Sequence, residues 1–184
     1  MGFEIEIKVK VDSLDAIREK LTSDSCEKIA DQDEYDIYFN SPVRDFAKSD
    51  EALRLRYVKN QTAGKAMPPC ITYKGPKAGR EGFKAREELI VDLSSGDEFA
   101  LILEKLGFRK TAEVVKHREI YQCENAIVTL DDLKGVGSFS EIEASFDLSE
   151  DEAVATIDKT AEKYGITGER LTKSYLEILL ESRK

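Results

Sequence analysis

The chain has no tryptophan, a single histidine and only three cysteines, and these shortages exclude several kinds of site. His117 alone supplies neither a multi-histidine metal centre nor a serine triad supported by a second histidine. Cys26, Cys70 and Cys123 lie far apart without metal-type spacing, so we expect reduced, buried or incidental thiols in a cytoplasmic protein. No apolar run approaches the roughly 18 residues that span a bilayer, and we expect no membrane partner.

Basic residues are also scarce relative to acidic ones. The chain carries 28 Lys and Arg against 37 Asp and Glu, a formal net charge of −9. A general nucleic-acid binder needs a basic surface and exposed stacking aromatics, so we expect no nucleic-acid partner. A concentrated basic pocket remains compatible, because net charge does not say where charges lie. The 184 residues fit a single domain, residues 1–184.

Alternation of charged and apolar residues is the dominant pattern. In "FEIEIKVKV", residues 3–11, the charged Glu4, Glu6 and Lys8 fall on one side of an extended chain and apolar residues fall on the other. Amphipathic helices separate such strands, which predicts an α+β domain with a large antiparallel sheet and helices on its apolar side. The capping signals are Asp12 or Ser13, Ser95, and a Ser149–Glu152 capping box, and the stop signals are Gly107 and Gly165. The expected strands are 3–11, 35–40, 52–58, 70–75, 85–93, 114–123, 126–133 and 138–148, and the expected helices are 12–21, 96–108, 149–165 and 172–182.

The charged positions share one face on strand after strand. This face either meets solvent, as in an open sheet, or lines the bore of a closed barrel whose apolar exterior is covered by helices. Closure would remove both sheet edges, and arginine outnumbers lysine among the bases, which favours phosphate recognition. The in-phase acids are Glu4, Glu6, Glu88, Asp131, Glu141 and Glu143; the in-phase bases are Lys8, Arg54, Arg56, Lys74, Arg86, Lys116 and Arg118.

Carboxylates and bases in one bore predict a particular chemistry. Clustered carboxylate oxygens suit Mg²⁺ or Mn²⁺ rather than zinc, and guanidinium and ammonium groups hold phosphates. The pattern therefore predicts a metal-dependent polyphosphate site. A non-catalytic polyphosphate or nucleotide sensor is the alternative, although a pure anion binder would do better without six acids beside its phosphates.

Several short motifs occur in a fixed order along the chain. They are "EIEIK" (4–8), "DIYF" (36–39), "LRLR" (53–56), "TYKGP" (72–76), "REE" (86–88), "KHR" (116–118), "LDDLKGVGSFSEIE" (130–143) and "TKSYLEILL" (172–180). In this order the motifs resemble those of the CYTH superfamily, the triphosphate tunnel metalloenzymes. "TYKGP" and "SYLEILL" are more similar to the class IV adenylyl cyclase branch than to the thiamine triphosphatase branch. The resemblance implies a closed tunnel of about eight antiparallel strands and a homodimer.

The resemblance also implies roles for the site residues. Glu4, Glu6, Glu141 and Glu143 correspond to ligands of Mg²⁺ or Mn²⁺, with Glu88 and Asp131 nearby. The triphosphate-binding positions are Lys8, Arg54, Arg56, Lys74, Arg86, Lys116, Arg118 and Lys173, of which Lys8, Lys74, Lys116 and Arg118 stabilise charge. These bases exceed the six acids by two charges, which one MgATP would offset. Asp36 and Tyr38 match a family motif without a firm role.

Two reactions fit the same tunnel. In the cyclase, the ribose 3′-hydroxyl of ATP attacks the α-phosphorus and pyrophosphate leaves, and this is the reaction we expect. In a triphosphatase, water attacks the terminal phosphorus of tripolyphosphate, a nucleoside triphosphate or thiamine triphosphate. The general base stays open between a hydroxide held by the metal and a deprotonated lysine.

Overall fold

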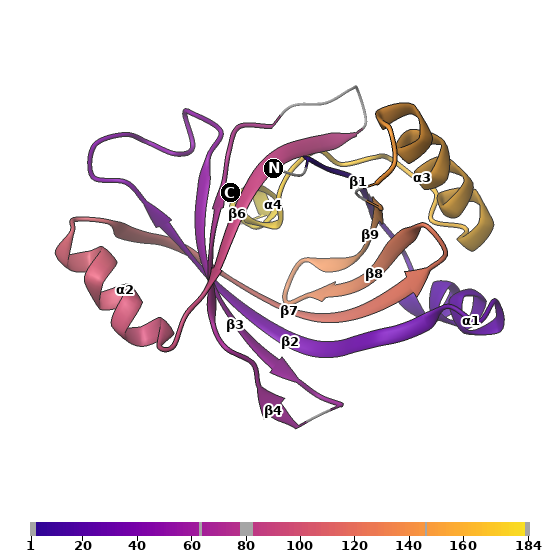
Figure 1. The fold of residues 1–184 in the computed structure, drawn as a ribbon, viewed down its shortest axis with the longest axis horizontal. Coiled ribbons are helices and arrows are strands. Elements are labelled where there is room, and N and C mark those ends of the chain that lie inside the picture. Colours follow the sequence, from indigo (N-terminus) through magenta and orange to yellow (C-terminus); the bar gives the residue numbers. More distant parts are fainter. Residues whose placement is uncertain (1–2, 63, 78–82, 146, 183–184) are drawn as a thin grey trace.

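The computed structural model describes residues 3–62, 64–77, 83–145 and 147–182, and the side chains of residues 3, 4, 84 and 85 lie outside this description. Strands dominate the N-terminal two thirds, and helices are interspersed (Figure 1). The elements are β1 (Phe3–Lys10), α1 (Leu14–Ser23), β2 (Glu27–Asn40), β3 (Ala52–Asn60), β4 (Lys65–Ala66), β5 (Cys70–Lys74), β6 (Lys84–Asp92), α2 (Gly96–Lys105), β7 (Arg109–Cys123), β8 (Ala126–Leu133), β9 (Gly137–Ala144), α3 (Glu150–Tyr164) and α4 (Tyr175–Ser182).

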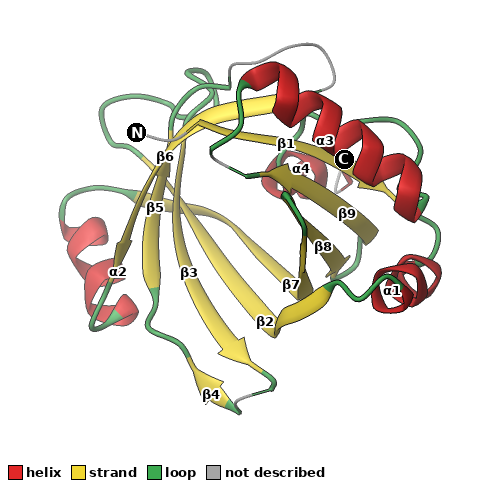
Figure 2. Cartoon of the chain, turned by 45° about the vertical axis from the view of Figure 1, so that its right-hand side comes forward, coloured by secondary structure: helices red, strands yellow, loops and turns green. Residues whose placement is uncertain are grey.

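All strands belong to one sheet. Its order is β2-β7-β8-β9-β1-β6-β5-β3-β4, every pairing between the described strands is antiparallel, and β2 pairs with β3 in addition. The sheet is strongly curled, with α1, α2 and α3 on its outer side, whereas α4 packs within the curl (Figures 1 and 2). The predicted α+β fold with an antiparallel sheet is thus confirmed, with eight long strands and, in the described ranges, four helices. The closed barrel expected from the sequence is not confirmed, because the sheet is a strongly curled half-barrel.

The helices begin and end where local chemistry requires. Ser13, Ser95 and Ser149 each have extended backbone and accept a hydrogen bond from the first helical turn, which satisfies an otherwise unpaired N–H. Ser149 and Glu152 complete a reciprocal capping box. Gly165 ends α3 at φ 71°, a conformation that costs glycine little. These caps agree with the prediction.

Two of the three clusters of the hydrophobic core lie outside the curl, between the sheet and α1, α2 and α3. Ile7, Leu21, Val128, Ile142 and Ile157 are at most 2% exposed and form one cluster under α1 and α3. A second cluster packs α2 against β2 and β3. The third packs α4 on the inner face of β7 and β9, so the expectation that all helices lie outside the sheet is wrong for α4, whose apolar partners continue the inward-facing rows of the strands. Each fully buried side chain of this size stabilises the fold by about 1.5–3 kcal/mol. Because the apolar face is occupied by helices, the charged face must turn inward.

Two strands are longer than predicted. β2 begins at Glu27 and β7 at Arg109, and the two pair along almost their whole lengths. Their extra residues are mostly polar, so apolar alternation does not reveal them; long-range pairing holds them extended.

The cysteines require a correction. Cys26 and Cys123 form a disulfide, with their Cα atoms 4.9 Å apart, whereas Cys70 is a free thiol. The prediction of reduced cysteines is therefore wrong for this pair, and the argument from cysteine usage to a cytoplasmic location loses its basis. The two residues are 97 positions apart, and the β2–β7 register, which pairs Glu27 with Gln122, brings them together.

Within the described ranges, no helix is both long and apolar enough to cross a membrane.

Candidate functional site

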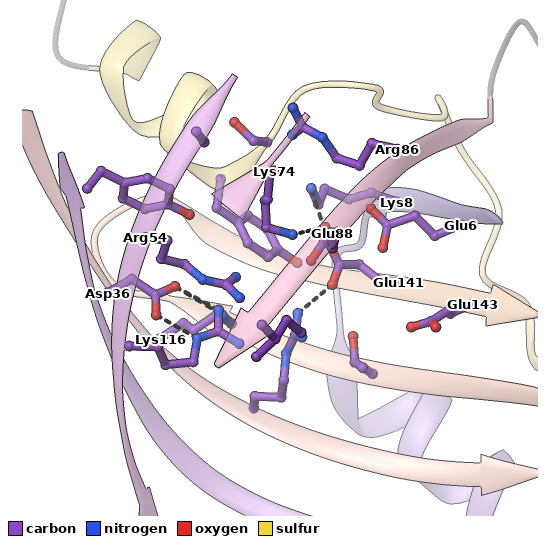
Figure 3. A pocket seen from close by; sticks show the side chains of 18 of the residues that line it. Glu6, Lys8, Asp36, Arg54, Lys74, Arg86, Glu88, Lys116, Glu141 and Glu143 are labelled. Atoms are coloured by element: carbon purple, nitrogen blue, oxygen red, sulfur yellow. Dashed lines mark hydrogen bonds and ion pairs between the residues drawn. The ribbon is translucent and has the colours of Figure 1, made fainter. Parts of the chain in front are cut away.

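The charged face of the curled sheet lines one cavity, shown in Figure 3. Every long strand contributes side chains to the cavity wall. Residues two positions apart on a strand point to the same face, so the charged row of each strand faces the cavity. The structure thus brings together eleven of the predicted site residues: Glu6, Lys8, Arg54, Arg56, Lys74, Arg86, Glu88, Lys116, Arg118, Glu141 and Glu143. Asp131 lies directly behind this wall and is fully buried.

An ion-pair network occupies the side of the cavity nearest α4. Arg118 makes a two-pronged contact with Asp131, with Nε–Oδ1 and Nη2–Oδ2 both at 2.6 Å, and also contacts Glu141. Lys8 Nζ lies 3.2 Å from Glu141 Oε1. Burial lowers the pKa of Arg118, but Asp131 and Glu141 raise it well above its usual range. Arg118 is therefore held as a cation.

Tyr175 connects this network to α4. Its hydroxyl donates to Asp131 Oδ2 at 2.5 Å, and its ring packs edge-on against Phe139. Lys8 Nζ lies 4.2 Å from the ring centroid, a cation–π distance. Burial, followed by the charges of Asp131 and Glu141, raises the pKa of Tyr175 well above its ordinary value, so the phenol stays protonated. The sequence analysis assigned Tyr175 no role.

A second network joins β2, β3 and β7. Arg56 forms two hydrogen bonds with Asp36, at 2.6 and 2.7 Å, and an ion pair with Glu34 at 2.8 Å. Lys116 contacts Glu34 as well. Burial by itself raises the pKa of Asp36. The positive charges of Arg56 and Lys116 outweigh this effect and lower the pKa to about 2. Both acids are at most 2% exposed and carry charge.

Sequence reasoning missed Glu34 and left Asp36 without a role. The available signal was their spacing: they lie two positions apart, in the same phase as Tyr38 on β2. The expected strand began at residue 35, so Glu34 was outside it.

Lys116 differs from the other lysines of the cavity. Burial lowers its pKa most, Arg56 lowers it further, and Glu34 does not fully compensate. Lys116 consequently gives up its proton more readily than an ordinary lysine.

Arg54 and Arg86 are the cations of the wall without a carboxylate partner among the described residues. Arg86 is 4% exposed and donates to backbone oxygens, with Nε at 2.8 Å from Gly75 O and Nη2 at 2.9 Å from Asp50 O. Arg54 donates from Nη2 to Thr72 Oγ1 at 3.1 Å, and its buried Nε has no partner in the described structure. Arg54 Nε is a buried charged donor without a partner, which is costly, and no described carboxylate balances the charge of either guanidinium group, so both favour a bound anion.

Counting the network acids changes the charge balance. Glu34 and Asp36 add two negative charges that the sequence arithmetic omitted, and Lys173 does not line the cavity. Among the described side chains, seven cations of the wall face seven carboxylates at or directly behind it, so the expected excess of two positive charges is absent. The cations are Lys8, Arg54, Arg56, Lys74, Arg86, Lys116 and Arg118; the acids are Glu6, Glu34, Asp36, Glu88, Asp131, Glu141 and Glu143.

Two predicted site residues stand apart from this set. The side chain of Lys173 is 51% exposed and pairs with Glu181 at 2.7 Å, although its backbone oxygen accepts a hydrogen bond from Lys8 Nζ at 3.0 Å. The side chain of Glu4 lies outside the described part of the chain.

The carboxylates suit a hard divalent cation in chemistry. Glu6 and Glu143 are register partners on β1 and β9, and Glu141 is two positions from Glu143 on the same strand. Glu88 and Asp131 are instead engaged by Lys74 and Arg118. Within the described ranges, no three acidic, thiol or imidazole side chains are arranged to hold a metal ion by themselves. Mg²⁺ commonly takes only one or two carboxylates and completes its shell with water and substrate phosphates, and the Glu6–Glu143 pair fits that mode.

Comparison with known protein families identifies the chain. The CYTH domain model matches residues 2–175. The chain belongs to the CYTH family. The predicted resemblance is thereby confirmed. Two relatives of this CYTH protein are named as adenylate cyclases. "Putative adenylate cyclase MJ0240" of Methanocaldococcus jannaschii is 36% identical over 95% of the chain and 97% of its own length, and "Adenylate cyclase CyaB" of Aeromonas hydrophila is 28% identical over 98% and 90%.

Solved structures share the fold. PH1819 of Pyrococcus horikoshii superposes with a TM-score of 0.84 at 36% identity, covering 98% of this chain and 99% of that one. HpAC1 from Hippeastrum, whose structure is described as revealing a dominant triphosphatase activity, has a TM-score of 0.72 at 19% identity, covering 97% and 96%. The latter identity shows a common fold only.

Proposed function

We propose that this CYTH protein is a Mg²⁺- or Mn²⁺-dependent class IV adenylyl cyclase that converts ATP to cyclic AMP and pyrophosphate inside the curled sheet. The observation that carries the proposal is the cavity wall, in which all eight long strands contribute side chains and two arginines lack a carboxylate partner in the described structure. The strong curl of the sheet, to which the β2–β3 ladder contributes, supports a site that surrounds the triphosphate.

The charge balance supports the metal requirement. A wall whose described charges cancel cannot by itself neutralise a triphosphate, so positive charge has to arrive with the substrate. A bound divalent cation would supply charge neutralisation on the phosphate oxygens. Glu6 and Glu143 would hold it, and Glu4 and Glu141, the latter ion-paired with Lys8 and Arg118, are further predicted ligands.

The remaining residues bind and orient the phosphates. Arg54 and Arg86 offer donors that the folded chain leaves without a carboxylate, and Lys8 and Lys74 lie in the same wall. Their task is positioning and stabilisation of charge as the 3′-oxygen forms its bond to the α-phosphorus and the bond to pyrophosphate breaks.

A triphosphatase is the second candidate. The activity attributed to HpAC1 favours it, since that protein has the same fold. The same wall would then bind a triphosphate while water attacks the terminal phosphorus and orthophosphate leaves.

Product analysis distinguishes these reactions. The protein is incubated with Mg²⁺ or Mn²⁺ and, separately, ATP, tripolyphosphate and thiamine triphosphate. Cyclic AMP and pyrophosphate support the cyclase, whereas orthophosphate supports the hydrolase. Unreacted ligands that raise the melting temperature would indicate a non-catalytic binder. Absence of both turnover and a thermal shift would contradict the proposal.

Two variants test the assigned residues. Glu6→Gln keeps the size of the side chain but removes a charged ligand, and we expect loss of metal-dependent turnover. Arg54→Ala should weaken triphosphate binding while the melting temperature stays near the wild-type value. Arg109→Ala, which removes an exposed arginine of β7, is the control and should change neither quantity. Full activity of Glu6→Gln would count heavily against the metal assignment.

A further inference from the structure

Two isoleucines interrupt the charged wall of the cavity. Ile90 on β6 and Ile127 on β8 line it together with the acids and bases. Ile90 is 56% exposed, so its side chain contributes little to the hydrophobic core. An apolar side chain held open to an ionic cavity is not explained by folding, and its position suggests contact with an apolar part of a ligand.

Both isoleucines lie away from α4. On β6, the inward-facing row runs Arg86, Glu88, Ile90, and Arg86 borders a hollow that Ser174 and Leu176 also line. On β8, the row runs Asp131, Thr129, Ile127, and Asp131 accepts the hydroxyl of Tyr175. Each row therefore starts beside α4.

The two rows run in the same direction. β6 is antiparallel to β1, β1 to β9 and β9 to β8, so the step from 86 to 90 and the step from 131 to 127 point the same way. Four residues of strand correspond to about 13 Å, which places each isoleucine about that far along its strand from the charged residue beside α4.

Carboxylates lie at the same end as Ile127. The β8–β9 register pairs Ile127 with Glu143, and the β1–β9 register pairs Glu143 with Glu6. In Figure 3, Glu143 lies far from the yellow helix α4, whereas Arg86 lies close to it. The inward rows of β6 and β8 thus run from charged residues beside α4, Arg86 and Asp131, to isoleucines at the opposite end, where Glu143 also lies.

We propose that Ile90 and Ile127 bind the uncharged base of a nucleoside triphosphate that enters with its terminal phosphate toward α4. This inference rests on the proposed triphosphate site and adds the direction of the phosphate chain and a contact for the organic end. The terminal phosphates lie near Arg86 and Lys8, and the α-phosphorus lies toward Glu6 and Glu143. A flat, neutral base covers the apolar side chains and loses less hydration than a phosphate would at the same place.

The test compares ATP with tripolyphosphate, which has no organic end. Affinities of both for the full-length protein are measured by calorimetry with Mg²⁺ in wild type, Ile90→Ala and Val91→Ala. Val91 is the matched control, because it is 59% exposed on the same strand but points to the other face. We expect Ile90→Ala to weaken ATP binding about tenfold, equivalent to the loss of two or so buried methylene groups, and to leave tripolyphosphate unchanged. Val91→Ala should change neither affinity.

Each other outcome overturns the inference. An unchanged ratio of ATP to tripolyphosphate affinity in Ile90→Ala excludes the base contact while leaving the triphosphate site intact. An equal loss for both ligands assigns Ile90 to the phosphates or to the fold, which melting temperatures separate. A selective loss for thiamine triphosphate, measured in parallel, replaces the neutral base with a cationic ring. Failure of wild type to bind either ATP or tripolyphosphate refutes the proposed function itself.

Discussion

Tyr175 on α4 donates its hydroxyl to Asp131 on β8 at 2.5 Å, and Asp131 in turn holds Arg118 through both of its oxygens. A helix at the C-terminal end of the chain thereby orients an arginine of the cavity wall. The helix packs on the sheet through a hydrophobic cluster, and its tyrosine carries the polar connection.

Removing this hydroxyl should loosen the network without collapsing it. In Tyr175→Phe, the ring still packs against Phe139 and beside Lys8, but a buried carboxylate loses a donor. We expect the free energy of unfolding to fall by about 2 kcal/mol and triphosphate affinity to fall with it, as measured by urea denaturation and calorimetry. Tyr73→Phe, which removes a hydrogen bond to Glu51 in a contact remote from Asp131, serves as control and should leave affinity unchanged.

Neutralising Asp36 should change both stability and the metal requirement. Asp36→Asn removes the charge that pairs with Arg56, and breaking a buried pair costs about 3 kcal/mol of unfolding free energy. The cavity also gains one net positive charge. We therefore expect ATP to bind more tightly than in wild type when EDTA is present, which equilibrium dialysis measures. Asp33→Asn, on the outward side of the same strand, should show no such effect; metal-free affinity equal to wild type in Asp36→Asn would contradict the charge argument.

Acid should destabilise the protein through Glu119. Burial by itself raises the pKa of this carboxyl. Hydrogen bonds from Arg18 and Lys28 outweigh burial and lower the pKa from an ordinary value of 4.5 to about 2. Because the folded pKa is depressed, ionised Glu119 stabilises the fold above about pH 4.5, and this contribution is lost as the pH falls toward 2.

The Glu119→Gln variant tests that dependence. Its free energy of unfolding should lie below wild type at pH 6, and the difference should shrink steadily between pH 4.5 and pH 2. Chemical denaturation at several pH values measures it. Glu27→Gln, an exposed carboxyl on β2, provides the comparison and should follow wild type throughout. A difference that is constant with pH would refute the assignment.

Reducing the disulfide should lower stability without altering the cavity. Cys26 and Cys123 close a chain segment of 97 residues, and a loop of that length restricts the unfolded chain by about 4 kcal/mol in the loop-entropy description. The Cys26→Ala/Cys123→Ala protein should unfold at lower urea concentration, yet bind triphosphate as wild type does, because the cavity wall is built from other residues. Cys70→Ala should leave stability nearly unchanged, and equal stability of the double variant and wild type would contradict the expectation.

Local signals accounted for most elements. The caps at Ser95, Ser149 and Gly165 appear where the prediction placed them, since capping depends on neighbouring backbone groups alone. The strand phase was also readable, because alternation has a period of two whatever the partner strand. The early parts of β2 and β7 were not readable: their polar residues are held extended by each other, through a ladder between distant segments.

By itself, the sequence determined which side chains share a face, and hence that acids and bases occur together on the inner side of an antiparallel sheet. Only the tertiary structure decided which acid meets which base. The alternation along one strand does not fix its register with the next strand. The pairing of Arg56 with Asp36 and the disulfide between Cys26 and Cys123 therefore follow only from the folded structure, as does the outward position of Lys173. The physical reason is that face depends on local backbone geometry, whereas charge balance and cross-links depend on contacts between segments far apart in the chain.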